Sequence, residues 1–177
     1  MPAARFVEAL NEQIGNEFGA SQSYAAMAVH YDAETLPQLA AFFYRQSIEE
    51  RNHAMMMVQY LLDAGAEITI AGVDAPRTQF ADIVEPVAAA LDQEKRVSDQ
   101  IERLAQIARE QNDFTSEQFI QWFLKEQVEE VATMSALLAV AQRSRDNAML
   151  VEDFIAREHS GSATVDPTAP PAAGGAL

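Results

Sequence analysis

The sequence predicts an all-α protein, namely a four-helix bundle with one long crossover, a short fifth C-terminal helix and a disordered tail. Three observations lead to this prediction. No glycine or proline occurs from Val87 to Ser160, a stretch too long for strands and turns but natural for long helices. Apolar residues recur at helical spacing through four segments of about 28 residues each. A connection of about 15 residues separates the second and third segments, which is long enough to cross the bundle.

Local signals place each helix in turn. The first ends before Leu36-Pro37, and the second begins at Pro37, since proline favours the first helical turn, and ends with Gly65 as its C-cap. The third starts near Asp82, which forms a capping box with Glu85. The fourth follows an Asn-Asp break, and the fifth is a short amphipathic segment. The predicted helices are 4–32, 37–64, 82–110, 115–143 and 146–159.

By length the 177 residues form one domain, large enough to bury a core of its own. We assign residues 1–160 to the bundle with its fifth helix. From 161 to 177 the composition changes to mainly Ala, Pro, Gly, Ser and Thr, which predicts a disordered tail. An alternative is a tether, since prolines and glycines would hold the terminal Ala176-Leu177 away from the bundle.

Charge and composition exclude several classes of function. Asp and Glu total 27 against 12 Lys and Arg, a net charge of −15, which argues against nucleic acid and an anionic membrane surface as partners. The absence of cysteine removes disulfides, thiolate metal sites and cysteine nucleophiles. No apolar run approaches the ~18 residues of a membrane span, and residues 1–10 have no hydrophobic signal core. We therefore expect a soluble, cytoplasmic protein.

Each long helix carries carboxylates near the middle of its core-facing seam. Steps of three and four residues trace seams that are apolar or small toward both ends. No Lys or Arg lies on any of the four seams. Since an isolated buried carboxylate costs several kcal/mol, the converging acids predict a bound cation. The acids and their polar neighbours at mid-seam are Glu17, Glu50, His53, Glu94, Gln127 and Glu130.

The spacing of these residues repeats between the two helix pairs. Glu17 precedes Glu50 by 33 residues, and Glu94 precedes Gln127 by 33 residues. The first pair ends in Glu-x-x-His and the second in Gln-x-x-Glu, each with two side chains one turn apart on one face. Two hairpins related by a pseudo-twofold axis would bring both sets together, as in carboxylate dimetal sites. Oxygen ligands with one imidazole favour iron or manganese over metals that prefer thiolates.

With these residues in place, the sequence resembles the haem-free bacterial ferritins over about Arg5 to His159. Its most specific segments are Asn16-Glu17-Phe18, the six residues from Glu49 to Ala54, and the ten from Gln121 to Glu130. The resemblance implies a hollow homo-oligomeric shell of 24 subunits that oxidises Fe(II) with O₂ and stores ferric mineral inside. Carboxylates facing the cavity would nucleate that mineral.

The resemblance also implies roles for individual residues. Glu17 and His53 would bind the first iron of a di-iron centre, Glu50 would bridge, and Glu94 and Glu130 would bind the second. Gln127 would be a polar neighbour of the site. Further matches are the tyrosine beside the ferroxidase centre, Tyr24, a nearby tryptophan, Trp122, and three carboxylates for a third, weaker iron, Glu49, Glu126 and Glu129. From spacing alone, a solvated acidic helix face explains those three carboxylates equally well.

The chain departs from sister families at informative positions. Bacterioferritins carry Glu-x-x-His on the fourth helix, where this chain has Gln127-x-x-Glu130, and place the haem-ligating Met where this chain has Arg51. We therefore expect no haem. Rubrerythrins need Cys pairs for an additional iron. The small ferritin-like DNA-protecting shells build their sites between subunits and generally lack a fifth helix.

Two other classes of function fit the same bundle. A different dimetal enzyme, such as an oxygenase, would need a pocket for an organic substrate and usually a longer chain. A non-enzymatic acidic helical adaptor would bind no metal. For the tail, some ferritin-like proteins are loaded into larger protein compartments through C-terminal extensions, so docking to another protein compartment is a further expectation.

Overall fold

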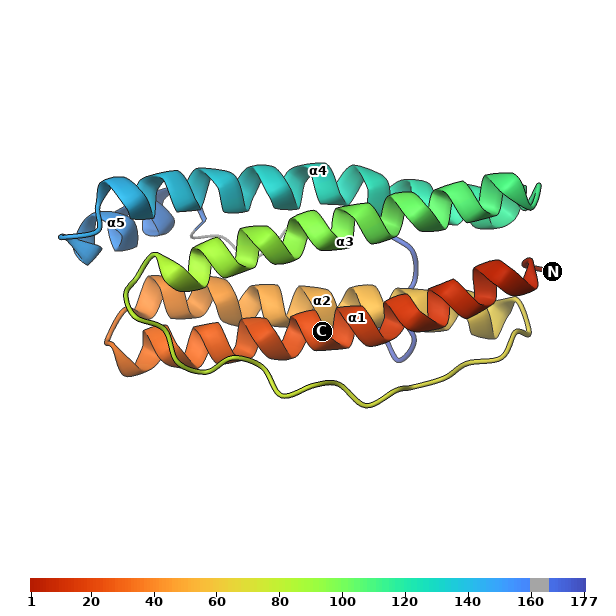
Figure 1. The fold of residues 1–177 in the computed structure, drawn as a ribbon, viewed down its shortest axis with the longest axis horizontal. Helices are drawn as coiled ribbons and strands as arrows, with labels where there is room; N and C mark the ends of the chain where they lie inside the picture. The colour runs from red at the N-terminus through yellow and green to blue at the C-terminus, as the bar shows by residue number, and fades with distance from the viewer. Residues whose placement is uncertain (160–165) are drawn as a thin grey trace.

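Five helices occupy most of the residues that the computed structural model describes, which are 1–159 and 166–177. The pairs α1–α2 and α3–α4 form two long hairpins, and α5 packs at one end against α2 and α4 (Figure 1). The described residues contain no strand, so the predicted all-α fold is confirmed. The helices are α1 (Ala4–Ala33), α2 (Pro37–Asp63), α3 (Glu85–Glu110), α4 (Phe114–Arg143) and α5 (Ala148–Glu158).

The connection between α2 and α3 runs along the length of the bundle beside α1 (Figure 1). Asn11 of α1 holds it, because its Nδ2 donates to the carbonyl oxygen of Glu67 (3.0 Å) and its Oδ1 accepts from the amide of Thr69 (2.6 Å). This is the long crossover that the sequence predicted, and it carries the chain from the end of one hairpin to the start of the other.

α2 ends where the chain requires a glycine. Gly65 has a φ of 62°, a left-handed conformation that costs glycine little. Its amide donates to the carbonyl of Leu62, and the amide of Ala66 donates to that of Leu61, both at 3.0 Å. This pair of bonds is a Schellman motif, so Gly65 ends the helix as predicted, one residue after the C-cap Ala64.

α3 begins at Glu85, three residues later than the predicted start near Asp82. Asp82 Oδ1 accepts from the amides of Val84 and Glu85 at 2.9 Å, and Glu85 Oε2 accepts from the amide of Ala81 at 2.6 Å. A capping box would need Glu85 to accept from the amide of Asp82, and the N-cap of α3 is Val84, whose side chain makes no capping bond, so the predicted capping box is not formed. Pro86, which lacks an amide hydrogen, lies in the first turn of α3, where proline is tolerated.

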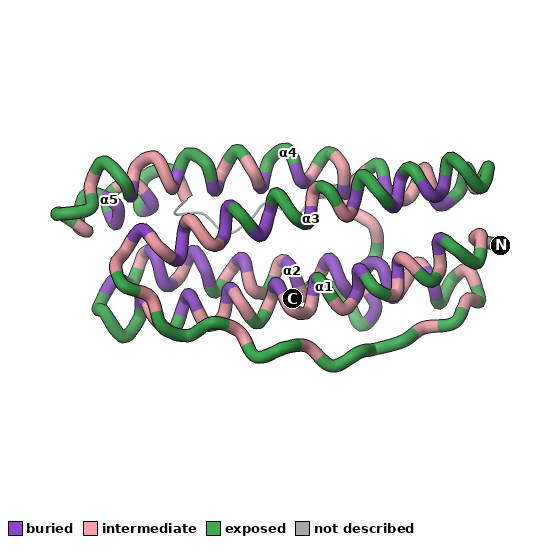
Figure 2. Tube along the Cα trace, in the orientation of Figure 1, coloured by how far each residue is buried: buried purple, intermediate pink, exposed green. Residues whose placement is uncertain are grey.

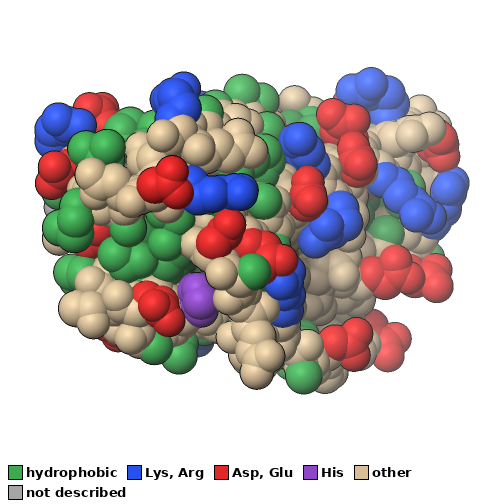
Figure 3. Space-filling view, turned by 60° about the vertical axis from the view of Figure 1, so that its left-hand side comes forward, with side chains coloured by type: hydrophobic (Ala, Val, Ile, Leu, Met, Phe, Trp, Pro, Cys, Tyr) green, Lys and Arg blue, Asp and Glu red, His purple; other side chains and the backbone are tan. Residues whose placement is uncertain are grey.

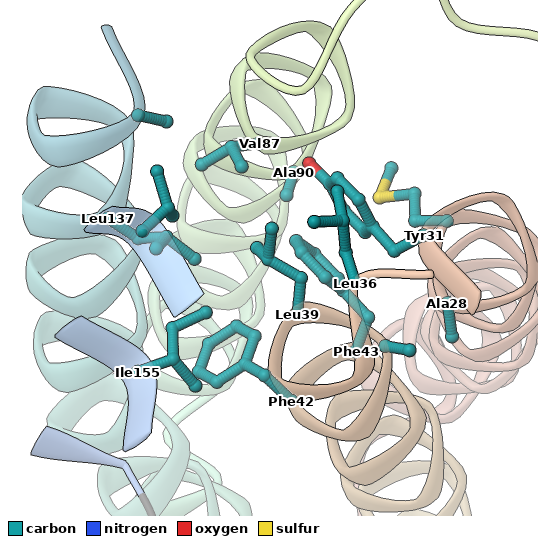
Figure 4. Packing of buried hydrophobic residues seen from close by; sticks show 14 of the residues in the cluster. Ala28, Tyr31, Leu36, Leu39, Phe42, Phe43, Val87, Ala90, Leu137 and Ile155 are labelled. Atoms are coloured by element: carbon teal, nitrogen blue, oxygen red, sulfur yellow. The ribbon is translucent and has the colours of Figure 1, made fainter. Parts of the chain in front are cut away.

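The apolar core consists of two clusters, one toward each end of the bundle, and the buried residues line the inner faces of the helices (Figure 2). The cluster near α5 packs Tyr31, Leu39 and Phe43 against residues of α3, α4 and α5 (Figure 4). The cluster at the other end includes Phe6 and Ile101. The predicted seams are therefore apolar toward both ends, and the polar residues lie between the two clusters.

α5 is attached to the bundle by a buried carboxylate. Glu152 is 4% exposed, and its two oxygens accept hydrogen bonds from the amides of Gln38 (2.9 Å) and Leu39 (2.8 Å). These amides belong to the first turn of α2, whose own N-cap residue, Leu36, offers no side-chain acceptor. Glu152 thus caps α2 from a distant helix and adds a negative charge where the helix dipole favours one.

Residues 166–177 pack on the bundle, which corrects the expectation of disorder for this part of the tail. The amide of Ala173 donates to the carbonyl of Met55 on α2 (2.9 Å), and Asp166 Oδ2 accepts from Trp122 Nε1 on α4 (3.1 Å). Small side chains let the backbone approach the helix, and prolines reduce the entropy that the unfolded segment loses. The two glycines after Ala173 have φ of 78° and 85°. The earlier predicted tail residues, 161–165, lie outside the described residues.

No helix in the described part of the chain has both the length and the apolar composition of a membrane span. On the face that Figure 3 shows, Lys and Arg side chains lie among Asp and Glu side chains. The acid surplus of the chain is divided between this mixed surface and a buried layer in the bundle.

Candidate metal centre

A layer of polar side chains crosses the bundle between the two apolar clusters. All four long helices contribute to it, and each of its six members is at most 7% exposed. Their burial confirms the predicted seams, whereas their role as metal ligands stays a prediction. The members are Glu17 from α1, Glu50 and His53 from α2, Glu94 from α3, and Gln127 and Glu130 from α4.

Three of these side chains form a cluster of the size that holds a metal ion. Glu17, Glu50 and His53 each offer one ligand atom, and these atoms lie within 4.8 Å of one another. His53 Nδ1 lies 3.3 Å from Glu50 Oε2. Gln13 Nε2 donates to Glu17 Oε1 at 2.9 Å, while Glu17 Oε2 is buried without a hydrogen-bond partner. A buried carboxylate oxygen without a donor is costly unless a cation occupies the space beside it.

Glu94, on the other side of the layer, is held by neutral donors. The hydroxyl of Tyr24 donates to Glu94 Oε1, and Gln127 Nε2 donates to Glu94 Oε2 at 3.2 Å. The hydroxyl of Ser98 donates to the backbone carbonyl of Glu94 at 2.8 Å. Tyr24 is fully buried, as a packing aromatic would be, and in addition it fixes this carboxylate.

Burial raises the pKa of all four glutamates in the layer. The pKa of Glu17 is raised by burial and further by the neighbouring Glu50 carboxylate. The pKa values of Glu50 and Glu130 are also raised well above the ordinary value, by burial first and then by surrounding acids. For Glu94 burial raises the pKa, while the hydrogen bond from Tyr24 acts in the opposite direction. A divalent cation would compensate these charges in place of protons.

A second cluster adjoins the first through the same histidine. Ligand atoms of Glu49, His53 and Glu126 lie within 4.8 Å of one another. Glu49 and Glu126 are half-buried, and Gln46 Nε2 donates to Glu49 Oε2 at 2.7 Å. Two of the three additional carboxylates are therefore brought together. The third, Glu129, is exposed, lies 3.9 Å from Lys125 Nζ and belongs to neither cluster.

The donor set fits iron. Carboxylate oxygens with one imidazole suit Fe(II), Fe(III) and Mn(II), and thiolates are absent from the sequence. Among the described residues, no Lys or Arg forms an ion pair with a carboxylate of the layer. None of the described ion pairs therefore brings a Lys or Arg charge to the unpartnered oxygen of Glu17.

Several polar residues that support the centre were not predicted from the sequence. Gln13, 2% exposed, orients Glu17, and Gln46, 6% exposed, orients Glu49. Ser98 accepts from Gln127 Nε2 at 3.3 Å. Gln46 and Ser98 lie on the predicted seams, and Gln13 precedes Glu17 by one helical turn. The spacing therefore predicts that these side chains point inward, but it does not predict their hydrogen-bond partners.

Comparison with known proteins gives consistent similarities. A family model described as a ferritin-like domain matches residues 7–144. The chain is 54% identical over 173 residues to "Ferritin BfrB" of Mycolicibacterium smegmatis, covering 98% of this chain and 95% of that protein. It is 34% identical over 166 residues to "Bacterial non-heme ferritin" of Staphylococcus aureus, covering 94% and 99%. An open pore ferritin from the archaeon Archaeoglobus fulgidus superposes with a TM-score of 0.84 at 26% identity, covering 88% of this chain and 98% of that one.

Proposed function

The chain belongs to the ferritin family, and on that premise we propose that it stores iron after oxidising Fe(II) with O₂ at the buried polar layer. The observation that supports this most strongly is the geometry around Glu17. Its Oε2 is buried and has no hydrogen-bond partner, while Glu50 and His53 offer ligand atoms within 4.8 Å. The protein would supply charge compensation and geometry, and the iron would supply the electrons.

Each residue of the layer has a defined part in this proposal. Glu17 and His53 would hold one Fe(II), Glu94 and Glu130 the other, and Glu50 would bridge them. The two Fe(II) would each give one electron to O₂, which with two protons would become hydrogen peroxide. The hydroxyl of Tyr24 and the amide of Gln127 keep the Glu94 carboxylate oriented. The cluster of Glu49, His53 and Glu126 would take a third, more weakly held iron.

Release of the oxidised product also follows from the ligands. Carboxylates dominate the layer, and His53 is its single imidazole. Glu49 and Glu126 lie half-exposed beside it. This gradient from buried to exposed acids would let Fe(III) leave toward mineral, with the second cluster as an intermediate position. We expect no haem, because this chain has Arg51 at the position where bacterioferritins carry the methionine that ligates haem.

Ferritins assemble, so we propose a homo-oligomer and, more specifically, a shell of 24 subunits. The cytoplasm remains the predicted location. Docking of the C-terminal tail to another protein compartment also remains a prediction. Because residues 166–177 bond to α2 and α4 of their own chain, such docking would require this segment to detach first.

The proposal is tested by mixing Fe(II) with O₂ in a stopped-flow instrument. We expect rapid oxidation by the wild type and, for Glu50→Ala combined with Glu130→Ala, a rate no faster than that of protein-free solution. Exposed Glu129→Ala serves as a matched control that keeps the wild-type rate. Oxidation by the double variant at the wild-type rate would refute the assignment.

Light scattering tests the proposed shell, since 24 subunits of 19.5 kDa give about 470 kDa.

A further inference from the structure

The C-terminal segment 166–177 spans the side of the bundle on which α2 and α4 carry the second cluster. We call this segment the strap. Its first residue bonds to α4 through Trp122, and its last, Leu177, exchanges hydrogen bonds with Asn52 of α2 at 3.1 and 3.4 Å. Figure 1 shows it passing from the level of α4 to that of α2. The contacts at both ends lie within four residues of a member of the second cluster.

Asp166 is the fixed point of the strap. Its Oδ1 accepts from the amide (2.8 Å) and the hydroxyl (2.6 Å) of Thr168, which locks the carboxylate in a local turn. Its Oδ2 accepts from Trp122 Nε1 at 3.1 Å and lies 3.6 Å from Lys125 Nζ. The indole is thereby held by a strong acceptor, since a charged oxygen forms a stronger bond than a neutral one.

Trp122 in turn packs on the histidine that both clusters share. Its ring lies edge-on to the imidazole of His53, with centroids 5.6 Å apart and an interplanar angle of 73°. Phe123 packs against both rings, at 5.0 Å and 90° from Trp122 and at 5.8 Å and 78° from His53. An indole fixed in this way restricts the rotation of the imidazole beside it.

We infer that Asp166 is a positioning residue for the iron site, because it fixes the Trp122 indole that packs against His53. The inference rests on the proposed function, because the position of the His53 imidazole matters for iron only if His53 is a ligand. Asp166 itself touches neither cluster. Its effect would pass through Trp122, and it would pre-organise the one side chain on which both clusters depend.

The chain contains a single tryptophan, so intrinsic fluorescence reports this contact directly in the metal-free protein. We expect Asp166→Ala to shift the Trp122 emission and to weaken anaerobic Fe(II) binding, measured by calorimetry, by up to about tenfold, the lower end of the loss seen when a direct hydrogen-bond partner of a metal ligand is removed. Asp166→Asn keeps an oxygen acceptor for the indole, so its emission and affinity should return most of the way to those of the wild type.

A double-mutant cycle separates positioning from a merely structural effect. Trp122→Phe breaks the same bond from the other side, and in its background Asp166→Ala should weaken Fe(II) binding no further. An equal loss in both backgrounds overturns the inference, as does unchanged emission and affinity in Asp166→Ala. If the wild type itself binds no Fe(II) in the layer, the proposed function fails instead. Asp166 is only partly buried, and Trp122→Phe provides the second variant should Asp166→Ala not fold.

Discussion

The hydroxyl of Tyr24 on α1 donates a hydrogen bond to Oε1 of Glu94 on α3, across the centre of the bundle. The pKa of Tyr24 is raised well above its ordinary value, first by burial and then by Glu94. The phenol therefore keeps its proton throughout the working pH range and acts as a permanent donor. This bond joins the two helix hairpins at the level of the candidate metal centre and links the apolar packing of Tyr24 to the orientation of a predicted ligand.

Removing this donor should affect both stability and iron chemistry. We expect Tyr24→Phe to destabilise the metal-free protein by about 1–2 kcal/mol, because a buried carboxylate oxygen loses its partner. Fe(II) oxidation should slow several-fold, since Glu94 is no longer held in place. Denaturant unfolding and stopped-flow oxidation measure the two effects.

Tyr31→Phe is the matched control for Tyr24→Phe. Tyr31 is equally buried, and its hydroxyl donates to the backbone carbonyl of Ile83 at 2.7 Å, away from the polar layer. We expect this variant to lose comparable stability and to oxidise Fe(II) at the wild-type rate. Equal slowing in both variants would show that Tyr24 acts through general packing alone.

Two buried glutamates should respond to neutralisation with opposite signs. Glu50→Gln removes a charge that faces other acids, so we expect the metal-free protein to gain about 1–3 kcal/mol. Glu152→Gln weakens two charge-assisted bonds to the amides of α2, so we expect a loss of about 1–2 kcal/mol. Unfolding of the metal-free variants measures both changes.

Added metal distinguishes the two variants further. Divalent cations should raise the unfolding temperature of Glu152→Gln as they do that of the wild type, and should have little effect on Glu50→Gln. A destabilised metal-free Glu50→Gln variant would contradict our view that the carboxylates of the layer await a cation.

The raised pKa values make the metal-free protein sensitive to pH in a defined direction. The pKa values of Glu17, Glu50, Glu94 and Glu130 are higher in the folded than in the unfolded chain. Above the ordinary value of 4.5 the folded chain therefore holds more protons than the unfolded one, and stability falls as pH rises through the raised values.

Metal binding should reverse this dependence. An incoming cation displaces protons from the layer, so affinity should increase with pH and calorimetry in buffers of different ionisation enthalpy should detect proton release. Binding of Fe(II) without release of protons near neutral pH would argue that the carboxylates are already ionised and compensated in another way.

The second cluster predicts that substitutions of three neighbouring acids differ in their effect on Fe(II) oxidation. Glu49→Gln and Glu126→Gln remove members of the cluster, so we expect repeated additions of Fe(II) to be oxidised more slowly than in the wild type, because iron leaves the first site less readily. Glu129→Gln should behave as the wild type, since that side chain is exposed and outside the cluster. Equal effects of all three substitutions would indicate a general influence of surface charge.

Much of this architecture could be predicted from the sequence because the relevant signals are local. The periodicity of apolar residues predicts the seams, and the acids at mid-seam predict the layer. Gly65 marks the end of α2, and the Asp82–Glu85 pair lies within three residues of the start of α3. These signals lie within one or two turns of the residues they describe.

The parts that could not be predicted depend on contacts between distant segments. The resemblance places Tyr24 beside the iron centre, but nothing near it in the sequence indicates that its hydroxyl reaches Glu94, 70 residues away. The strap was predicted to be disordered from its composition, yet Asp166 reaches Trp122, 44 residues away. Glu129 was grouped with Glu126 because both are acids of the same helix near Glu130, but in the folded helix Glu129 is exposed to solvent. Such pairings follow from the folded geometry.

The central claim is that iron binds in the buried layer between the two apolar clusters. Crystals of the protein soaked anaerobically with Fe(II) and measured at the iron absorption edge test it most directly. We expect one anomalous peak among Glu17, Glu50 and His53 and a second beside Glu94 and Glu130. Iron found solely at surface carboxylates, with none in the layer, would contradict the account.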